Sequence, residues 1–149
     1  NHLSDIVWAL KPDNHNVGSI IARIREQSAM LLEPAGIKLH IRDSNLFTQA
    51  FNEVMLKEIL LITKEAIHNI VKHSGAKNVY IGWNPPTKNA GMEFYIKDDG
   101  IWKAKSDHVG SGSGVKNMES RAAKMGTMFS ILRSDSGTTI TIKWPHASS

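Results

Sequence analysis

Hydrophobic residues recur along the chain with two different periods, and each period predicts one kind of element. Apolar residues spaced three and four positions apart predict helices over residues 3–11, 20–32, 52–73 and 115–125. Alternation of apolar and polar residues predicts strands over residues 37–42, 78–83, 92–98, 128–133 and 138–144. This order of elements predicts an α+β fold that is a two-layer sandwich of helices and sheet.

Turn-forming residues separate the predicted elements. Pro12-Asp13-Asn14-His15-Asn16 divides the first two helices, and Pro34-Ala35-Gly36 ends the second. Residues 85–89 join the second and third strands, and Asp135-Ser136-Gly137 joins the last two. Gly126 is placed to cap the C-terminus of the last helix.

The helix predicted over residues 52–73 has an apolar stripe and a polar side opposite it. The stripe comprises Leu56, Ile59, Leu60, Thr63, Ile67, Ile70 and Val71. On the other side, Glu65, Asn69, Lys72 and His73 fall within an arc of about 80–100°. Glu65 is suited to orient or deprotonate a hydroxyl, Asn69 to coordinate magnesium, and Lys72 to contact phosphate. The alternative is the solvated side of an ordinary amphipathic helix.

A second candidate is the aspartate that ends the strand over residues 92–98. The period of two places Asp98 on the core-facing side, where a carboxylate needs a polar partner such as the exocyclic amine of adenine. Gly100 lets backbone pass close to a ligand, and Thr138 begins the last strand on its core-facing side. The alternative is a strand-end turn, for which Asp-Asp-Gly is common, and an ordinary strand threonine.

A third candidate is the glycine-rich stretch before the last helix. Gly110-Ser111-Gly112-Ser113-Gly114 leads into the helix predicted from Val115, and amides at a helix N-terminus bind phosphate. The sequence has no Gly-x-x-x-x-Gly-Lys-Ser/Thr phosphate loop, and no strand directly precedes the glycines as in a dinucleotide fingerprint. A flexible linker is the alternative.

The three candidates occur in the order found in one ATPase superfamily. Residues 64–74 resemble the asparagine box of sensor histidine kinases, and residues 98–100 resemble their first glycine box. Residues 112–118 resemble the second glycine box, and Gly137-Thr138 resembles the closing Gly-Thr. Together, over about residues 37–145, they resemble the ATP-binding signature shared by gyrase, a heat-shock chaperone, histidine kinases and mismatch-repair ATPases. The short segment between the glycine boxes is similar to that of the nitrate-sensor class.

The resemblance implies a Bergerat-type ATP-binding fold over residues 36–149, with a mixed sheet covered on one face by helices. Residues 1–35 would be the end of a dimerisation helix and a connecting helix, because residues 5–12 are similar to the end of that class's second dimerisation helix. The implied ligands are ATP and Mg²⁺, with Glu65 catalytic and Asn69 on the metal. The implied ATP-binding residues are Asn69, Lys72, His73, Asp98, Gly100, Gly112, Gly114 and Thr138.

The implied reaction transfers the γ-phosphoryl group of ATP to a histidine on the dimerisation domain of the protein's own homodimer, with a response regulator as a further partner. The acceptor histidine of these kinases is followed by an acidic residue, and none of the seven histidines here is. We therefore expect the acceptor upstream of Asn1, in a longer cytoplasmic parent protein whose inner-membrane anchor, if it has one, lies outside these residues.

One residue departs from the family pattern. Trp102 stands where the first glycine box, Asp-x-Gly-x-Gly, has its second glycine. Its indole would obstruct the nucleotide, stack on it or point outward. An alternative function is therefore a non-catalytic signalling module with the same fold. A serine kinase of the anti-sigma type is a further alternative.

Composition and charge exclude several kinds of site and partner. The 149 residues contain no cysteine, which excludes disulfides, thiolate metal sites and cysteine nucleophiles. No apolar run approaches the roughly 20 residues that a membrane helix needs. A net charge of +4 suits an anionic partner, but lysines and arginines are scattered, so we expect no nucleic-acid partner.

Overall fold

A computed structural model describes residues 17–42, 52–101 and 113–146. The helix predicted over residues 3–11, the break after it, Trp102 and Gly112 lie outside these ranges. The described helices are α2 (Val17–Leu32), α3 (Glu53–His73) and α4 (Ser113–Lys124). The strands are β1 (Lys38–Arg42), β2 (Asn78–Asn84), β3 (Glu93–Asp98), β4 (Met128–Ser134) and β5 (Gly137–Lys143). For the elements within these ranges the predicted types are confirmed, and α4 begins two residues before the expected Val115.

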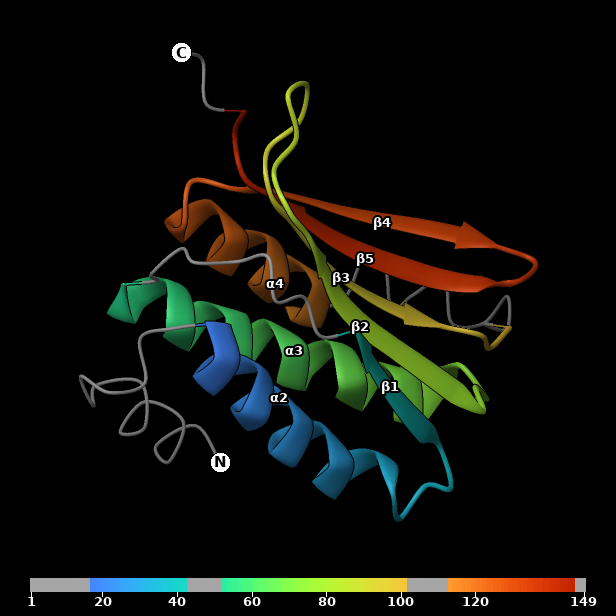
Figure 1. Ribbon diagram of the computed structural model, residues 1–149. Coiled ribbons are helices and arrows are strands. Elements are labelled where there is room, and N and C mark those ends of the chain that lie inside the picture. The colour runs from blue at the N-terminus through green and yellow to red at the C-terminus, as the bar shows by residue number, and fades with distance from the viewer. Residues whose placement is uncertain (1–16, 43–51, 102–112, 147–149) are drawn as a thin grey trace.

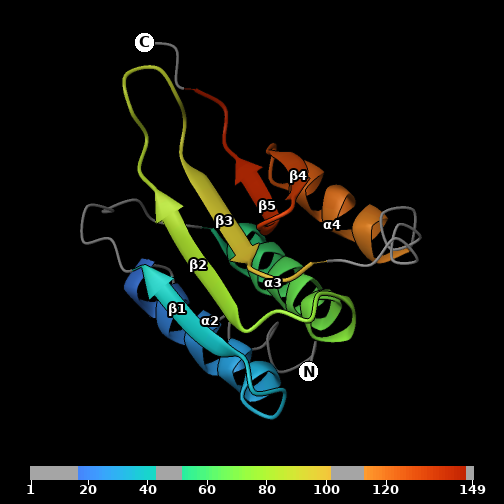
Figure 2. The ribbon, with the colours of Figure 1, turned by 90° about the vertical axis from the view of Figure 1, so that its right-hand side faces the viewer.

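The five strands form one mixed sheet in the order β1-β2-β3-β5-β4. β1 and β2 are parallel and joined through α3, whereas the other neighbours are antiparallel. The three helices pack on one face of the sheet (Figure 1), and the view in Figure 2 looks onto the opposite face. The predicted two-layer α+β fold is therefore confirmed. Among the described residues, no helix has the length and apolarity to cross a bilayer.

Helix α3 lies at the centre of the helical layer, between α2 and α4. Its N-terminus is capped by Asn52, whose Oδ1 accepts a hydrogen bond of 2.9 Å from the amide of Met55. The predicted stripe is buried except for Val71, which is 39% exposed. Val71 lies at the margin of the stripe, in the last turn of the helix, where it is open to solvent on one side.

The side of α3 opposite the stripe is not simply solvated, because α4 packs against it. Glu58 on this side is 0% exposed, and both of its carboxylate oxygens accept hydrogen bonds from Nη1 of Arg121 on α4, at 3.2 and 3.3 Å. α4 ends in a Schellman motif, with Gly126 at φ +71° and the amide of Thr127 bonded to the carbonyl of Ala122. The predicted cap is therefore confirmed.

Helix α2 shares the core of the rest of the chain. Its buried isoleucines pack in the same cluster as those of α3, and Nε2 of the buried Gln27 donates to the carbonyl of Leu60 at 3.0 Å. The division predicted after residue 35 stays a prediction. Helix α2, in the described part of the predicted connecting segment, is held on α3 by apolar burial and by a buried hydrogen bond.

Candidate functional site

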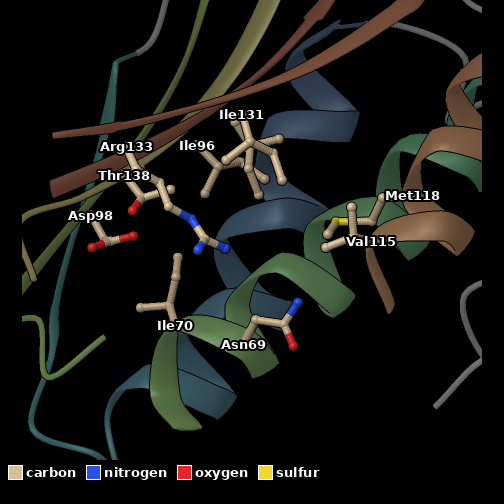
Figure 3. A pocket seen from close by; sticks show the side chains of 10 residues that line it. Asn69, Ile70, Ile96, Asp98, Val115, Met118, Ile131, Arg133 and Thr138 are labelled. Atoms are coloured by element: carbon tan, nitrogen blue, oxygen red, sulfur yellow. The ribbon is translucent and has the colours of Figure 1, made fainter. Parts of the chain in front are cut away.

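A pocket lies between the helix-facing side of the sheet and the helices α3 and α4 (Figure 3). Its walls are mostly aliphatic, with four polar or charged side chains among them. The lining residues are Asn69, Ile70, Ile96, Asp98, Val115, Met118, Ile131, Arg133, Thr138 and Ile140. The free volume between these side chains is about 10 Å³, comparable to the space that one water molecule needs.

Asp98 and Thr138 stand side by side at one end of this pocket. They are register partners on β3 and β5, and they are 1% and 4% exposed. The period of two in each strand therefore places both side chains on the helix-facing side, as predicted. Oδ1 of Asp98 also accepts a hydrogen bond of 2.9 Å from the amide of Gly100. The strand-end turn is thus formed, and the same carboxylate lines the pocket.

The next carboxylate in the sequence belongs to a different network. Oδ1 of Asp99 accepts from the amides of Lys77 and Asn78, and Oδ2 accepts from Nδ2 of Asn78, all at 2.9 Å. The hydrogen bond from the Asn78 side chain is the main reason why the pKa of Asp99 lies below its ordinary value. Asp99 ties the end of β3 to the start of β2 and does not line the pocket.

Helices α3 and α4 bring the asparagine-box and second glycine-box residues together. Asn69 lines the pocket from α3. A Cβ atom added to Gly114, in the first turn of α4, would lie 2.2 Å from Oε1 of Glu65 and 3.6 Å from Nδ2 of Asn69. Only a glycine fits here without displacing the Glu65 carboxylate. Glu65, Asn69 and the N-terminus of α4 therefore share one corner of the molecule.

The two predicted cations of α3 lie outside the pocket lining. Lys72 is exposed and His73 is half-buried, and neither side chain lines the pocket. The cation that does line it is Arg133 on β4, which the sequence prediction omitted. The alternation that predicted this strand already places Arg133 on the side of Phe129 and Ile131. The alternation thus indicated the side on which Arg133 lies, but it points to a pocket residue only once β4 is known to border the pocket.

Two glycines near Asp98 make close approaches to the protein's own backbone. A Cβ atom on Gly100 would lie 2.1 Å from the carbonyl oxygen of Ser74. Gly137 has φ +138°, and a Cβ atom there would lie 1.9 Å from the carbonyl oxygen of Asp98. These glycines fix the end of β3 against the end of α3 and the start of β5. They therefore determine where the Asp98 carboxylate stands.

Comparison with known proteins identifies the fold. No family model and no curated protein matches the sequence. The structure is similar to the ATP binding domain of PrrB from Mycobacterium tuberculosis, with 21% identity, a TM-score of 0.66, and coverage of 89% of this chain and 96% of that one. It is similar to the Acinetobacter baumannii histidine kinase AdeS, with 14% identity, a TM-score of 0.67, and coverage of 99% and 76%.

A third similar structure is the histidine kinase domain of the blue-light activated histidine kinase from Erythrobacter litoralis EL346. It has 16% identity and a TM-score of 0.68 over 85% of this chain. The chain spans 64% of the length of that domain. At these identities the likeness extends to the fold. The chain therefore has the fold of histidine kinase ATP-binding domains.

Proposed function

We propose that this chain is the ATP-binding catalytic domain of a bacterial two-component sensor histidine kinase, of the nitrate-sensor-like subclass. The observation that carries the proposal is the buried carboxylate of Asp98 beside the buried hydroxyl of Thr138, at the end of an otherwise aliphatic pocket. An apolar slot that ends in a hydrogen-bond acceptor is suited to a flat base with an exocyclic amine. The fold shared with histidine kinase ATP-binding domains supports adenine as that base.

In this proposal, the position of each residue determines its role in nucleotide binding and phosphoryl transfer. Asp98 accepts a hydrogen bond from the adenine amine, and Thr138 contributes its hydroxyl at the same end. The aliphatic side chains of Ile96, Ile140 and Met118 exclude water from the base. The phosphates extend toward Asn69 and the N-terminus of α4, where backbone amides and the helix dipole favour negative charge. Glu65, in the same corner, orients the phosphate acceptor.

The donor set around Asn69 fits Mg²⁺. The described residues contain no group of three histidine, cysteine, aspartate or glutamate side chains that would form a complete metal site. Mg²⁺ does not require one, because it keeps several waters and binds through one or two side-chain oxygens together with substrate phosphates. The Asn69 amide oxygen would hold it, close to the Glu65 carboxylate that orients the acceptor. When bound, Mg²⁺ neutralises part of the phosphate charge.

The phosphoryl acceptor in this proposal is a histidine of the dimerisation domain, outside these 149 residues. A response regulator then receives the phosphoryl group. The proposal therefore separates two activities. We expect the 149-residue chain to bind Mg²⁺-ATP and not to phosphorylate itself on histidine.

Two adjacent carboxylates allow a matched test of nucleotide binding. We expect calorimetric titration of the chain with Mg²⁺-ADP or a non-hydrolysable ATP analogue to show binding that Asp98→Asn abolishes. Asp99→Asn removes the same charge one residue away, outside the pocket, and should leave the affinity unchanged. Thermal unfolding without nucleotide checks that both variants are folded. Equal affinity in Asp98→Asn and the unaltered chain would sink the proposal, and absence of binding in the unaltered chain would favour the non-catalytic alternative.

A further inference from the structure

The register of the sheet places a cation on the same row as the two base-binding residues. Asp98 on β3 pairs with Thr138 on β5, and Thr138 pairs with Arg133 on β4. All three side chains therefore point to the helix-facing side. Since neighbouring strands lie about 4.8 Å apart, the Cα atoms of Asp98 and Arg133 are separated by about 10 Å across the pocket.

Arg133 lines the pocket while its side chain is also exposed to solvent. Of the ten described residues that line the pocket, Arg133 is the one cation and Asp98 the one anion. The apolar walls and the Asp98 carboxylate are suited to a base, but neither gives a favourable contact to the charged phosphates of a nucleotide. Lys72 of α3 is exposed as well, but it does not line the pocket. Arg133 is thus the lining side chain whose chemistry matches a phosphate group.

The direction of the side chain agrees with this chemistry. Figure 3 shows Arg133 extending from the sheet across the pocket, toward the side where α3 carries Asn69 and Ile70. Asn69 and Gly114 lie in the corner where α4 begins, at the proposed phosphate end. A nucleotide whose base is held at Asp98 and whose phosphates reach this corner must pass the guanidinium group.

We propose that Arg133 binds the phosphate chain of the nucleotide, as a contact residue of the site; this inference rests on the function proposed above. Because the free volume of the pocket is small, the long side chain of Arg133 gives way when the base enters and closes on the phosphates. The planar guanidinium can donate two parallel hydrogen bonds to phosphate oxygens. An arginine thus holds the phosphate chain from the β4 side, opposite the amides of α4.

The test compares ligands that carry different numbers of phosphates. Adenosine, AMP, ADP and ATP are titrated with Mg²⁺ into the chain and into Arg133→Met and Arg133→Lys, followed by amide chemical shifts. We expect Arg133→Met to weaken ADP and ATP about tenfold and to change adenosine by less than about twofold. Arg133→Lys should restore part of the loss, because it keeps the charge without the planar fork. Arg25→Met, which removes an exposed arginine of α2, is the control for net charge.

Three results would overturn the inference. The first is an unchanged affinity for ATP in Arg133→Met. The second is an equal loss for adenosine and ATP, which would assign Arg133 to the base or to the shape of the pocket. The third is an equal loss in Arg25→Met, which would indicate a general charge effect. If the unaltered chain binds none of the four ligands, the proposed function itself fails, and this outcome is distinct from the other three.

Discussion

The ion pair between Glu58 and Arg121 gives a stability prediction that can be worked from the structure. Glu58 is fully buried on α3, and Arg121 reaches it from α4 with 26% of its side chain exposed. Removing one partner of a buried pair leaves an uncompensated charge, which costs about 3–5 kcal/mol. Because water can reach the partly exposed arginine position, we expect Arg121→Met to cost less, about 2–3 kcal/mol. For a chain of this size, that lowers the melting temperature by about 6–12 °C.

The assay is a double-mutant cycle measured by urea unfolding at pH 7. Glu58→Met replaces the carboxylate with an apolar side chain of similar length, and the double variant buries two methionines in place of the ion pair. Since well-packed apolar replacements of buried pairs are often neutral, the double variant should recover most of the stability lost in Arg121→Met. Lys57 lies 3.7 Å from the Glu58 carboxylate with its own side chain 37% exposed. Lys57→Met should therefore cost less than about 1 kcal/mol.

Two outcomes would refute this reasoning. Arg121→Met within about 0.5 kcal/mol of the unaltered chain would mean that Lys57 and water compensate the Glu58 charge without the arginine. A double variant as unstable as Arg121→Met would mean that packing, and not the unpaired charge, sets the cost. The ion pair also affects the pocket. Arg121 holds α4 against α3, and Val115 and Met118 of α4 line the pocket.

Two further predictions concern residues next to the pocket. Gly114→Ala should change the melting temperature by only a few degrees, because alanine favours the helix and the Glu65 carboxylate, 2.2 Å from the new Cβ atom, can move. Gly100→Ala should destabilise the chain strongly, because the new Cβ atom would meet backbone atoms that cannot move aside. Thermal unfolding of both variants checks this prediction, and equal losses of melting temperature would contradict it. The folded-state pKa of Asp99 lies below its ordinary value near 3.8, so its contribution to stability is present above that value and is lost as the pH falls through the lower, folded-state pKa. Urea unfolding between about pH 5 and pH 2.5 should show the difference between the unaltered chain and Asp99→Asn shrinking as the pH falls, and a constant difference would contradict the assignment.

The sequence predicted the features that depend on local periodicity. The period of two placed Asp98 and Thr138 on the core-facing side before any neighbour was known, and the pairing of β3 with β5 then put them side by side. The helical period likewise placed Glu65 and Asn69 on one side of α3. These predictions needed only the geometry of a single element.

What the sequence did not predict depends on which elements become neighbours. Glu58 is an ordinary polar position on an isolated helix, and it is buried because Arg121, 63 residues away, arrives with α4. Arg133 looks like the polar end of a strand until the order β3-β5-β4 places it two strands from Asp98. Tertiary arrangement, and not residue type, decided both cases. Lys72 is exposed outside the pocket lining, and its predicted contact with phosphate stays a prediction.

The position of β5 has a consequence for how the chain is made. β5 is the last strand in the described sequence, yet it lies inside the sheet between β3 and β4. Until residues 137–143 leave the ribosome, β3 and β4 each present an unpaired edge, which is a hazard for aggregation. Thr138 and the register that aligns Arg133 with Asp98 also arrive with this strand. The pocket is therefore completed only after residues 137–143 have been synthesised, so a ligand of the pocket cannot assist the folding of β3 and β4 before then and can stabilise only the sheet that contains β5.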